Sequence, residues 1–162
     1  MNRQLTSKIA SIHFAPTLTA KKNLLNEGIK EDSIHVTGNT VVDALKKIRE
    51  KAKGIKFSDK LINDLPFLNN NEKIILVTGH RRENFGSGFE EICAGIKDIA
   101  LEFPSINIVY PVHLNPNVLE PTNKFIGNLK NVHLIQPVEY IHFIKLMEKS
   151  QLIITDSGGI QE

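Results

Sequence analysis

Cysteine is nearly absent from this chain of 162 residues. Its one cysteine, Cys93, excludes an internal disulfide framework and a metal cluster held by cysteines. Cys93 lies in an apolar-periodic segment, where a free thiol behaves as a small hydrophobe and is expected in the core. The histidines His13, His35, His133 and His142 lack the spacing of metal ligands, so no metal is expected.

Long apolar runs and a strong charge bias are also absent. No run approaches the roughly 20 residues that a helix needs to cross a membrane, and the N-terminus lacks the apolar core of a signal peptide. A cytoplasmic location without a membrane partner is therefore expected. Because 20 Lys and Arg balance 18 Asp and Glu, no nucleic-acid partner is expected either.

The first half of the chain predicts short strands and helices. Residues 12–15 and 34–37 read as strands, and residues 40–52 carry apolar side chains at helical spacing. A helix over residues 18–27 is predicted to be capped by Thr17 and closed by Gly28. Residues 52–71 are rich in Lys, Asn and Asp, which predicts a linker with at most one short helix.

The second half predicts a parallel, doubly wound α/β sheet, because strands alternate with helices. Helices are expected at 89–103, at 115–126 with Pro116 in the first turn, and at 140–150. The chain ends so soon after its last strand that the following helix is predicted to be missing. The strands are expected at residues 74–78, 106–111, 132–135 and 152–155.

Ligands of such sheets bind beyond the carboxyl ends of the strands, and polar loops follow three of the predicted strands. The first loop contains His80, Arg81 and Arg82, whose cationic donors suit a diphosphate. Its alternative interpretation is a solvated loop in which an arginine pairs with Glu83.

The loop after the last strand contains Asp156, Ser157, Gly158 and Gly159. The two glycines allow the backbone to approach an anion closely, and the serine hydroxyl is a donor. A carboxylate repels phosphate, so a structural or capping role is favoured for Asp156.

Two other side chains have open interpretations. His113, in the loop after residues 106–111, is either a ligand contact or a histidine that bonds to backbone. Phe143 lies on the helix before the last loop. Its spacing favours a core position over stacking on a base.

Five segments together resemble the bacterial non-hydrolysing UDP-N-acetylglucosamine 2-epimerases. They span nearly the whole chain, in order, which makes the resemblance highly specific. It implies a GT-B architecture of two Rossmann-like domains, with residues 1–37 ending the N-terminal domain, 38–71 crossing over and 72–162 beginning the C-terminal UDP-binding domain. The segments are residues 13–17, 36–45, 78–84, 109–117 and 155–162.

The resemblance implies epimerisation at C2 of UDP-GlcNAc to UDP-ManNAc by elimination and re-addition of UDP. No cofactor is needed, the product feeds surface polysaccharide synthesis, and the intact protein is expected to be a homodimer. The family's proton-abstracting carboxylates would lie before Met1, and its ribose-binding glutamate would be residue 163. The chain alone is therefore expected to be inactive.

The resemblance also assigns roles to single residues. His80 corresponds to a catalytic histidine that contacts the diphosphate, and Phe143 to the aromatic residue that packs on uracil. Arg81 and His113 correspond to a second, regulatory UDP-GlcNAc site. The phosphate cradle is formed by Ser157, Gly158 and Gly159.

Three alternatives remain. A GT-B glycosyltransferase that uses a UDP-sugar would share the fold and the anion-binding loop. A hydrolysing epimerase would release free ManNAc and UDP, but that group generally lacks the Gly79-His80-Arg81-Arg82-Glu83-Asn84 run. A non-catalytic UDP-sugar-binding remnant is the third.

Overall fold

The computed structural model describes residues 2–70, 72–79, 84 and 86–161. The chain divides into two compact units, residues 1–47 and 48–162. Helix α3 (Thr40–Ala52) begins in the first unit and ends in the second.

The first unit is a small α/β unit around a parallel pair of strands, β1 (His13–Ala15) and β2 (Ile34–Val36). Helix α2 (Leu18–Asn26) begins as predicted, because Thr17 Oγ1 accepts the N–H of Ala20 at 3.0 Å. Gly28 follows its end with φ +77°, also as predicted. Helix α1 (Asn2–Ile9) and the 3-10 helix η1 (Glu31–Ser33) were not expected from the sequence.

The second unit contains a four-stranded, wholly parallel sheet with the strand order β5-β4-β3-β6. This confirms the alternating pattern predicted for residues 74–155. The strands are β3 (Ile74–Thr78), β4 (Asn107–Pro111), β5 (Val132–Ile135) and β6 (Leu152–Thr155), and the longer helices are α5 (Ser87–Glu102), α6 (Pro116–Ile126) and α7 (Tyr140–Lys149).

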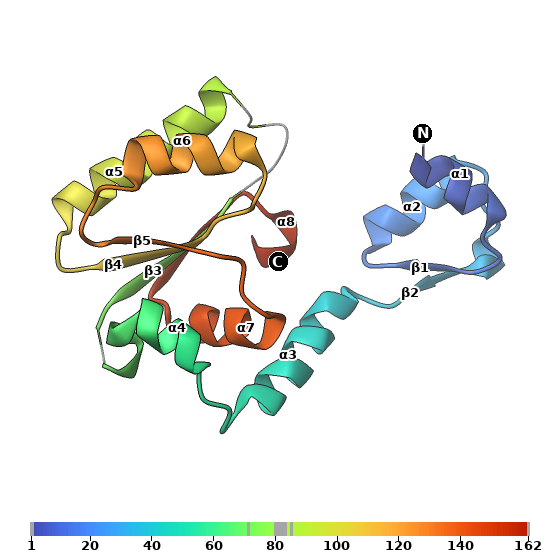
Figure 1. Cartoon of the computed structure of the whole chain (residues 1–162). Coiled ribbons are helices and arrows are strands. Elements are labelled where there is room, and N and C mark those ends of the chain that lie inside the picture. Colours follow the sequence, from blue (N-terminus) through green and yellow to red (C-terminus); the bar gives the residue numbers. More distant parts are fainter. Residues whose placement is uncertain (1, 71, 80–83, 85, 162) are drawn as a thin grey trace. The chain divides into compact units, whose positions relative to one another are not determined.

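Both faces of this sheet are covered (Figure 1). Ile75 and Val77 point to a core cluster shared with α5 and α6. Ile74 and Leu76 point to the opposite cluster, which is shared with α4 (Asp59–Asp64), η2 (Pro66–Asn69) and α7. Each fully buried side chain of this kind contributes about 1.5–3 kcal/mol, so strand β3 anchors both layers.

The segment predicted as a linker is part of the core, which corrects that interpretation. It holds one short α-helix, as expected, and also η2, which Pro66 opens. The segment is polar in composition, but its few apolar residues are spaced so that they face the sheet together. Four side chains from this segment are buried against the sheet, namely Leu61, Leu65, Phe67 and Leu68.

The helix predicted to be missing after β6 is present as a single turn, α8 (Gly158–Gln161). Ile160 N–H and Gln161 N–H both donate to the Ser157 carbonyl, at 3.2 and 3.3 Å. Residues 157–161 thus form the first turn of the helix, which the sequence had predicted to be missing.

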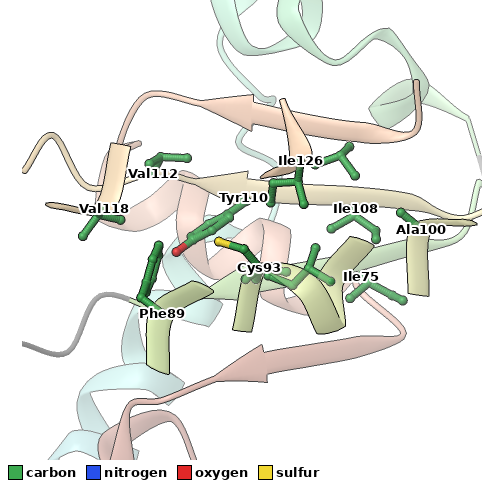
Figure 2. Close-up of a cluster of buried hydrophobic side chains, with 12 residues drawn as sticks. Ile75, Phe89, Cys93, Ala100, Ile108, Tyr110, Val112, Val118 and Ile126 are labelled. Carbon is green, nitrogen blue, oxygen red and sulfur yellow. The ribbon is translucent and has the colours of Figure 1, made fainter. Parts of the chain in front are cut away.

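Cys93 is buried in the first core cluster, as predicted (Figure 2). It lies on α5 beside the ring of Tyr110, among apolar side chains from the sheet and α6. Burial raises the pKa of its thiol to about 11, against a partial opposing effect of a hydrogen bond with Thr122. The folded state therefore holds this proton more tightly than the unfolded state does.

This pKa shift predicts a loss of stability at alkaline pH. Between the unfolded pKa and the folded one, the unfolded chain binds fewer protons at this thiol, so the contribution of Cys93 to the free energy of unfolding falls as pH rises from 9 towards 11. Urea unfolding at several pH values should show a shallower fall in Cys93→Ala. Cys93→Val, which fills more of the site, should behave in the same way. Parallel curves for wild type and both variants would contradict the assignment.

Candidate functional site

The strand order reverses between β3 and β6. Strand β6 follows β5 and α7 in sequence but pairs with β3, in a register that sets Thr78 beside Thr155. The loops that follow these two strands therefore start side by side. A reversal of this kind leaves a crevice outside the carboxyl ends of the strands, which is where ligands of open α/β sheets bind.

A cavity of about 290 Å³ lies at this end of the sheet. It is lined by residues that follow or end β3, β4, β5 and β6, together with one side chain of α7. Three of the predicted site residues, His113, Phe143 and Ser157, are among them. The other lining residues are Thr78, Pro111, Pro137, Val138 and Ile160.

Phe143 has the core position that its spacing favoured, and it also faces the cavity. It is half-buried, packs against the second core cluster and also lines the cavity. A ring held in this way by the core offers a fixed apolar surface to a ligand. Tyr140, on the same helix, is 52% exposed and does not line the cavity.

His113 is a histidine that bonds to backbone, which is one of its two alternatives, while a ligand contact stays a prediction. Its Nδ1 accepts the backbone N–H of Asn115 at 3.1 Å, and the ring lines the cavity. In the neutral ring the proton is then on Nε2. Asn115 in turn caps α6, since its Oδ1 accepts the N–H of Asn117 at 3.0 Å, so the cap of α6 fixes the orientation of the histidine.

The loop after β6 is linked to the loop after β3. Asn84 Nδ2 donates to Asp156 Oδ2 at 3.2 Å, which supports the structural role favoured for this carboxylate. Ser157 N–H donates to Thr155 Oγ1 at 3.0 Å, and Gly158 opens helix α8. Sequence reasoning did not single out Asn84, although it lies in the first polar loop.

Tyr110 was also missed, although it belongs to one of the matching segments. Its hydroxyl donates to the carbonyl of Gly79, and both residues are buried. Burial raises the pKa of the phenol far above its usual range, and the nearby Cys93 and Asp156 act in the same direction. The phenol therefore stays neutral and holds the chain where it leaves β3.

Two predicted site residues, His80 and Arg81, lie outside the described residues, as do Arg82 and Glu83. Gly159 is exposed next to Ser157. Among the residues that the structure describes, no group of three His, Cys, Asp or Glu side chains is placed to hold a metal ion.

The parallel sheet, its covered faces and a cavity at the strand reversal define a doubly wound, Rossmann-like α/β protein. The model of the UDP-N-acetylglucosamine 2-epimerase family matches residues 1–162. The chain belongs to this family.

Relatives and solved structures agree. The UDP-N-acetylglucosamine 2-epimerase of Escherichia coli K12 is 54% identical over 165 residues, covering 99% of this chain and 43% of that protein. The Neisseria meningitidis epimerase, solved with UDP-GlcNAc, is 48% identical and matches with a TM-score of 0.89. The match covers 99% of this chain and 43% of that chain. S. aureus MnaA, solved with UDP, is 38% identical and matches with a TM-score of 0.81. The match covers 99% of this chain and 42% of that chain.

These likenesses confirm the expected fold class, an α/β protein of the GT-B type with parallel sheets. The chain spans less than half of the length of these relatives. The division into domain segments at residues 37 and 71 stays a prediction.

Removing the Tyr110 hydroxyl should destabilise the fold. Tyr110→Phe leaves the buried Gly79 carbonyl without this partner, which costs about 1–3 kcal/mol in the free energy of unfolding. Tyr140→Phe is the matched control, because Tyr140 is exposed and its change should stay within about 0.5 kcal/mol. Urea unfolding of the two variants gives the comparison, and equal midpoints would show that this hydrogen bond carries no net stability.

Proposed function

We propose that this chain supplies the UDP-binding part of an enzyme that converts UDP-GlcNAc to UDP-ManNAc at C2. In this proposal UDP is eliminated and added again, and the product feeds surface polysaccharide synthesis. The observation that carries the proposal is the cavity at the β3–β6 reversal. It gathers Phe143, Ser157 and His113, the residues to which the family resemblance assigns ligand contacts.

The proposed roles follow from the chemistry of each group. The ring of Phe143 packs on uracil, while Ser157, Gly158 and Gly159 hold the diphosphate through a hydroxyl and backbone N–H groups. His80 acts as the catalytic histidine, because a cationic or hydrogen-bonding group stabilises the charge that develops on the departing diphosphate.

Arg81 and His113 are proposed to belong to a second, regulatory site for UDP-GlcNAc. The support is the place of His113 in the same cavity as Phe143 and the hydrogen bond from Asn115 N–H that orients its ring. A second sugar nucleotide bound there would adjoin the first.

The remaining proposals concern the whole protein. It acts without a metal or redox cofactor, works as a homodimer in the cytoplasm, and takes its proton-abstracting carboxylates from residues other than these 162. No helix in the described part of the chain is both long and apolar enough to cross a bilayer. We expect the chain by itself to bind UDP without turnover.

A chimera tests the activity. Residues 1–162 replace the matching segment of the Escherichia coli K12 relative, and NMR follows UDP-GlcNAc without any acceptor. We expect UDP-ManNAc to form, and His80→Asn to lower the rate about 100-fold or more, as for loss of a donor to a developing oxyanion. In a chimera that folds, two results would contradict the proposal. One is release of free ManNAc and UDP, and the other is transfer of the sugar that occurs only after an acceptor is added.

Phe143→Leu tests the uracil contact. Leucine keeps apolar packing against the core but removes the ring, and base–aromatic stacking is worth about 1–3 kcal/mol. The Kd for UDP should therefore rise about tenfold in an NMR titration of the chain. Phe125→Leu is the control, because Phe125 packs against the other core cluster. Equal weakening in the two variants would argue against a contact between the Phe143 ring and the base.

A further inference from the structure

One side of helix α7 contacts the segment that joins α3 to α4. Lys145 makes the central contact: its Nζ donates to the carbonyl of Ile55 and lies 5.0 Å from the centre of the Phe57 ring. A cation that donates to a carbonyl and covers an aromatic face makes two attractive contacts with one group. This side chain therefore fastens α7 to the joining segment.

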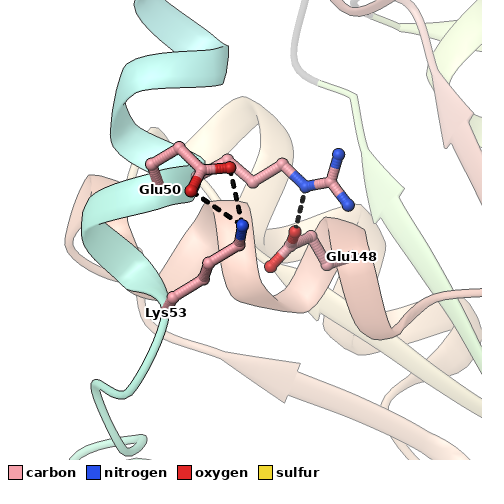
Figure 3. A network of polar contacts seen from close by, with 4 residues as sticks. Glu50, Lys53 and Glu148 are labelled. Carbon is pink, nitrogen blue, oxygen red and sulfur yellow. Dashed lines mark hydrogen bonds and ion pairs between the residues drawn. The ribbon is translucent and has the colours of Figure 1, made fainter.

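Two further contacts flank Lys145 at a spacing of three residues, which keeps all three side chains on one side of the helix. The His142 ring lies 6.2 Å from the Phe57 ring. Glu148 Oε1 accepts from Arg49 Nε at 2.5 Å, and Figure 3 shows Glu148 on the side of α7 that faces α3. The ion pair is exposed and adds little alone, so Lys145 is the main attachment.

The adjacent side of the same helix carries Phe143, the proposed contact to the base. Phe143 and Met147 pack against the second core cluster, and Phe143 also lines the cavity. A rotation of α7 about its axis would move the Phe143 ring within the cavity. Lys145 opposes that rotation, because its contacts attach α7 to the segment that joins α3 to α4.

We propose that Lys145 is a positioning residue for the nucleotide. It does not line the cavity, but it holds α7 in the rotation that presents the Phe143 ring to the base. This inference rests on the proposed function, since it needs UDP in that cavity. Coupling between two sites is reciprocal, so bound UDP should in turn protect the backbone around Ile55 and Phe57 from hydrogen exchange.

Lys145→Met removes the ammonium group and keeps most of the aliphatic stem. In an NMR titration of the full chain, the Kd for UDP should rise about fivefold, and UDP should no longer raise amide protection at residues 53–58. Lys145→Arg should restore affinity to within about twofold, because a guanidinium can donate to the carbonyl and stack on the ring. Lys124→Met is the matched control, since Lys124 lies 5.2 Å from the Phe125 ring, on α6.

The outcomes separate this inference from the proposed function. If wild type binds UDP and Lys145→Met binds as tightly as Lys124→Met, the positioning role is wrong while the UDP site stands. If wild type shows no shift with UDP, the proposed function fails at its first step and this inference fails with it. If Lys145→Met does not give the dispersed spectrum of a folded protein, Lys145→Gln is measured in its place. A Kd for UDP in Lys145→Gln equal to that of wild type would then overturn the positioning role.

Discussion

The parallel pairing of β3 with β6 is the constraint on which the candidate site depends. It places Thr78 next to Thr155, so the two loops that contain most of the expected ligand contacts begin at the same point. Asn84 and Asp156 then join those loops by a side-chain hydrogen bond. Without this pairing, Ser157 would have no fixed position relative to His113 and Phe143, and the cavity would lack one wall.

The other walls come from side chains that also hold the fold together. Phe143 belongs to the core and to the cavity, and His113 is oriented by the residue that caps α6. Tyr110 does not line the cavity, but it packs its ring in the first core cluster and donates its hydroxyl to the Gly79 carbonyl next to Thr78. The site is therefore preorganised by packing and capping, and a ligand meets groups that have already lost most of their conformational freedom.

The sequence predicted the second unit well because its strands are continuous apolar runs and its helices have clear periodicity. Residues 74–78, 132–135 and 152–155 are strands as expected. Leu61, Leu65 and Leu68 have helical spacing, but the surrounding Lys, Asn and Asp residues concealed their burial. The Asn84–Asp156 and Tyr110–Gly79 contacts depend on which strands are neighbours, and periodicity along one strand carries no information about strand order.

The strand order also has a consequence for how the chain folds. Between β3 and its partner β6 lie α5, β4, α6, β5 and α7 in sequence, so this pairing closes the longest loop in the sheet and is entropically the most costly to form. A chain growing on the ribosome exposes one edge of β3 until residue 155 has emerged. Until then residues 75–78 lack the backbone partners that β6 supplies, and an unpaired apolar strand edge tends to pair with other chains. The pairing that completes the candidate site therefore also protects this strand edge from other chains.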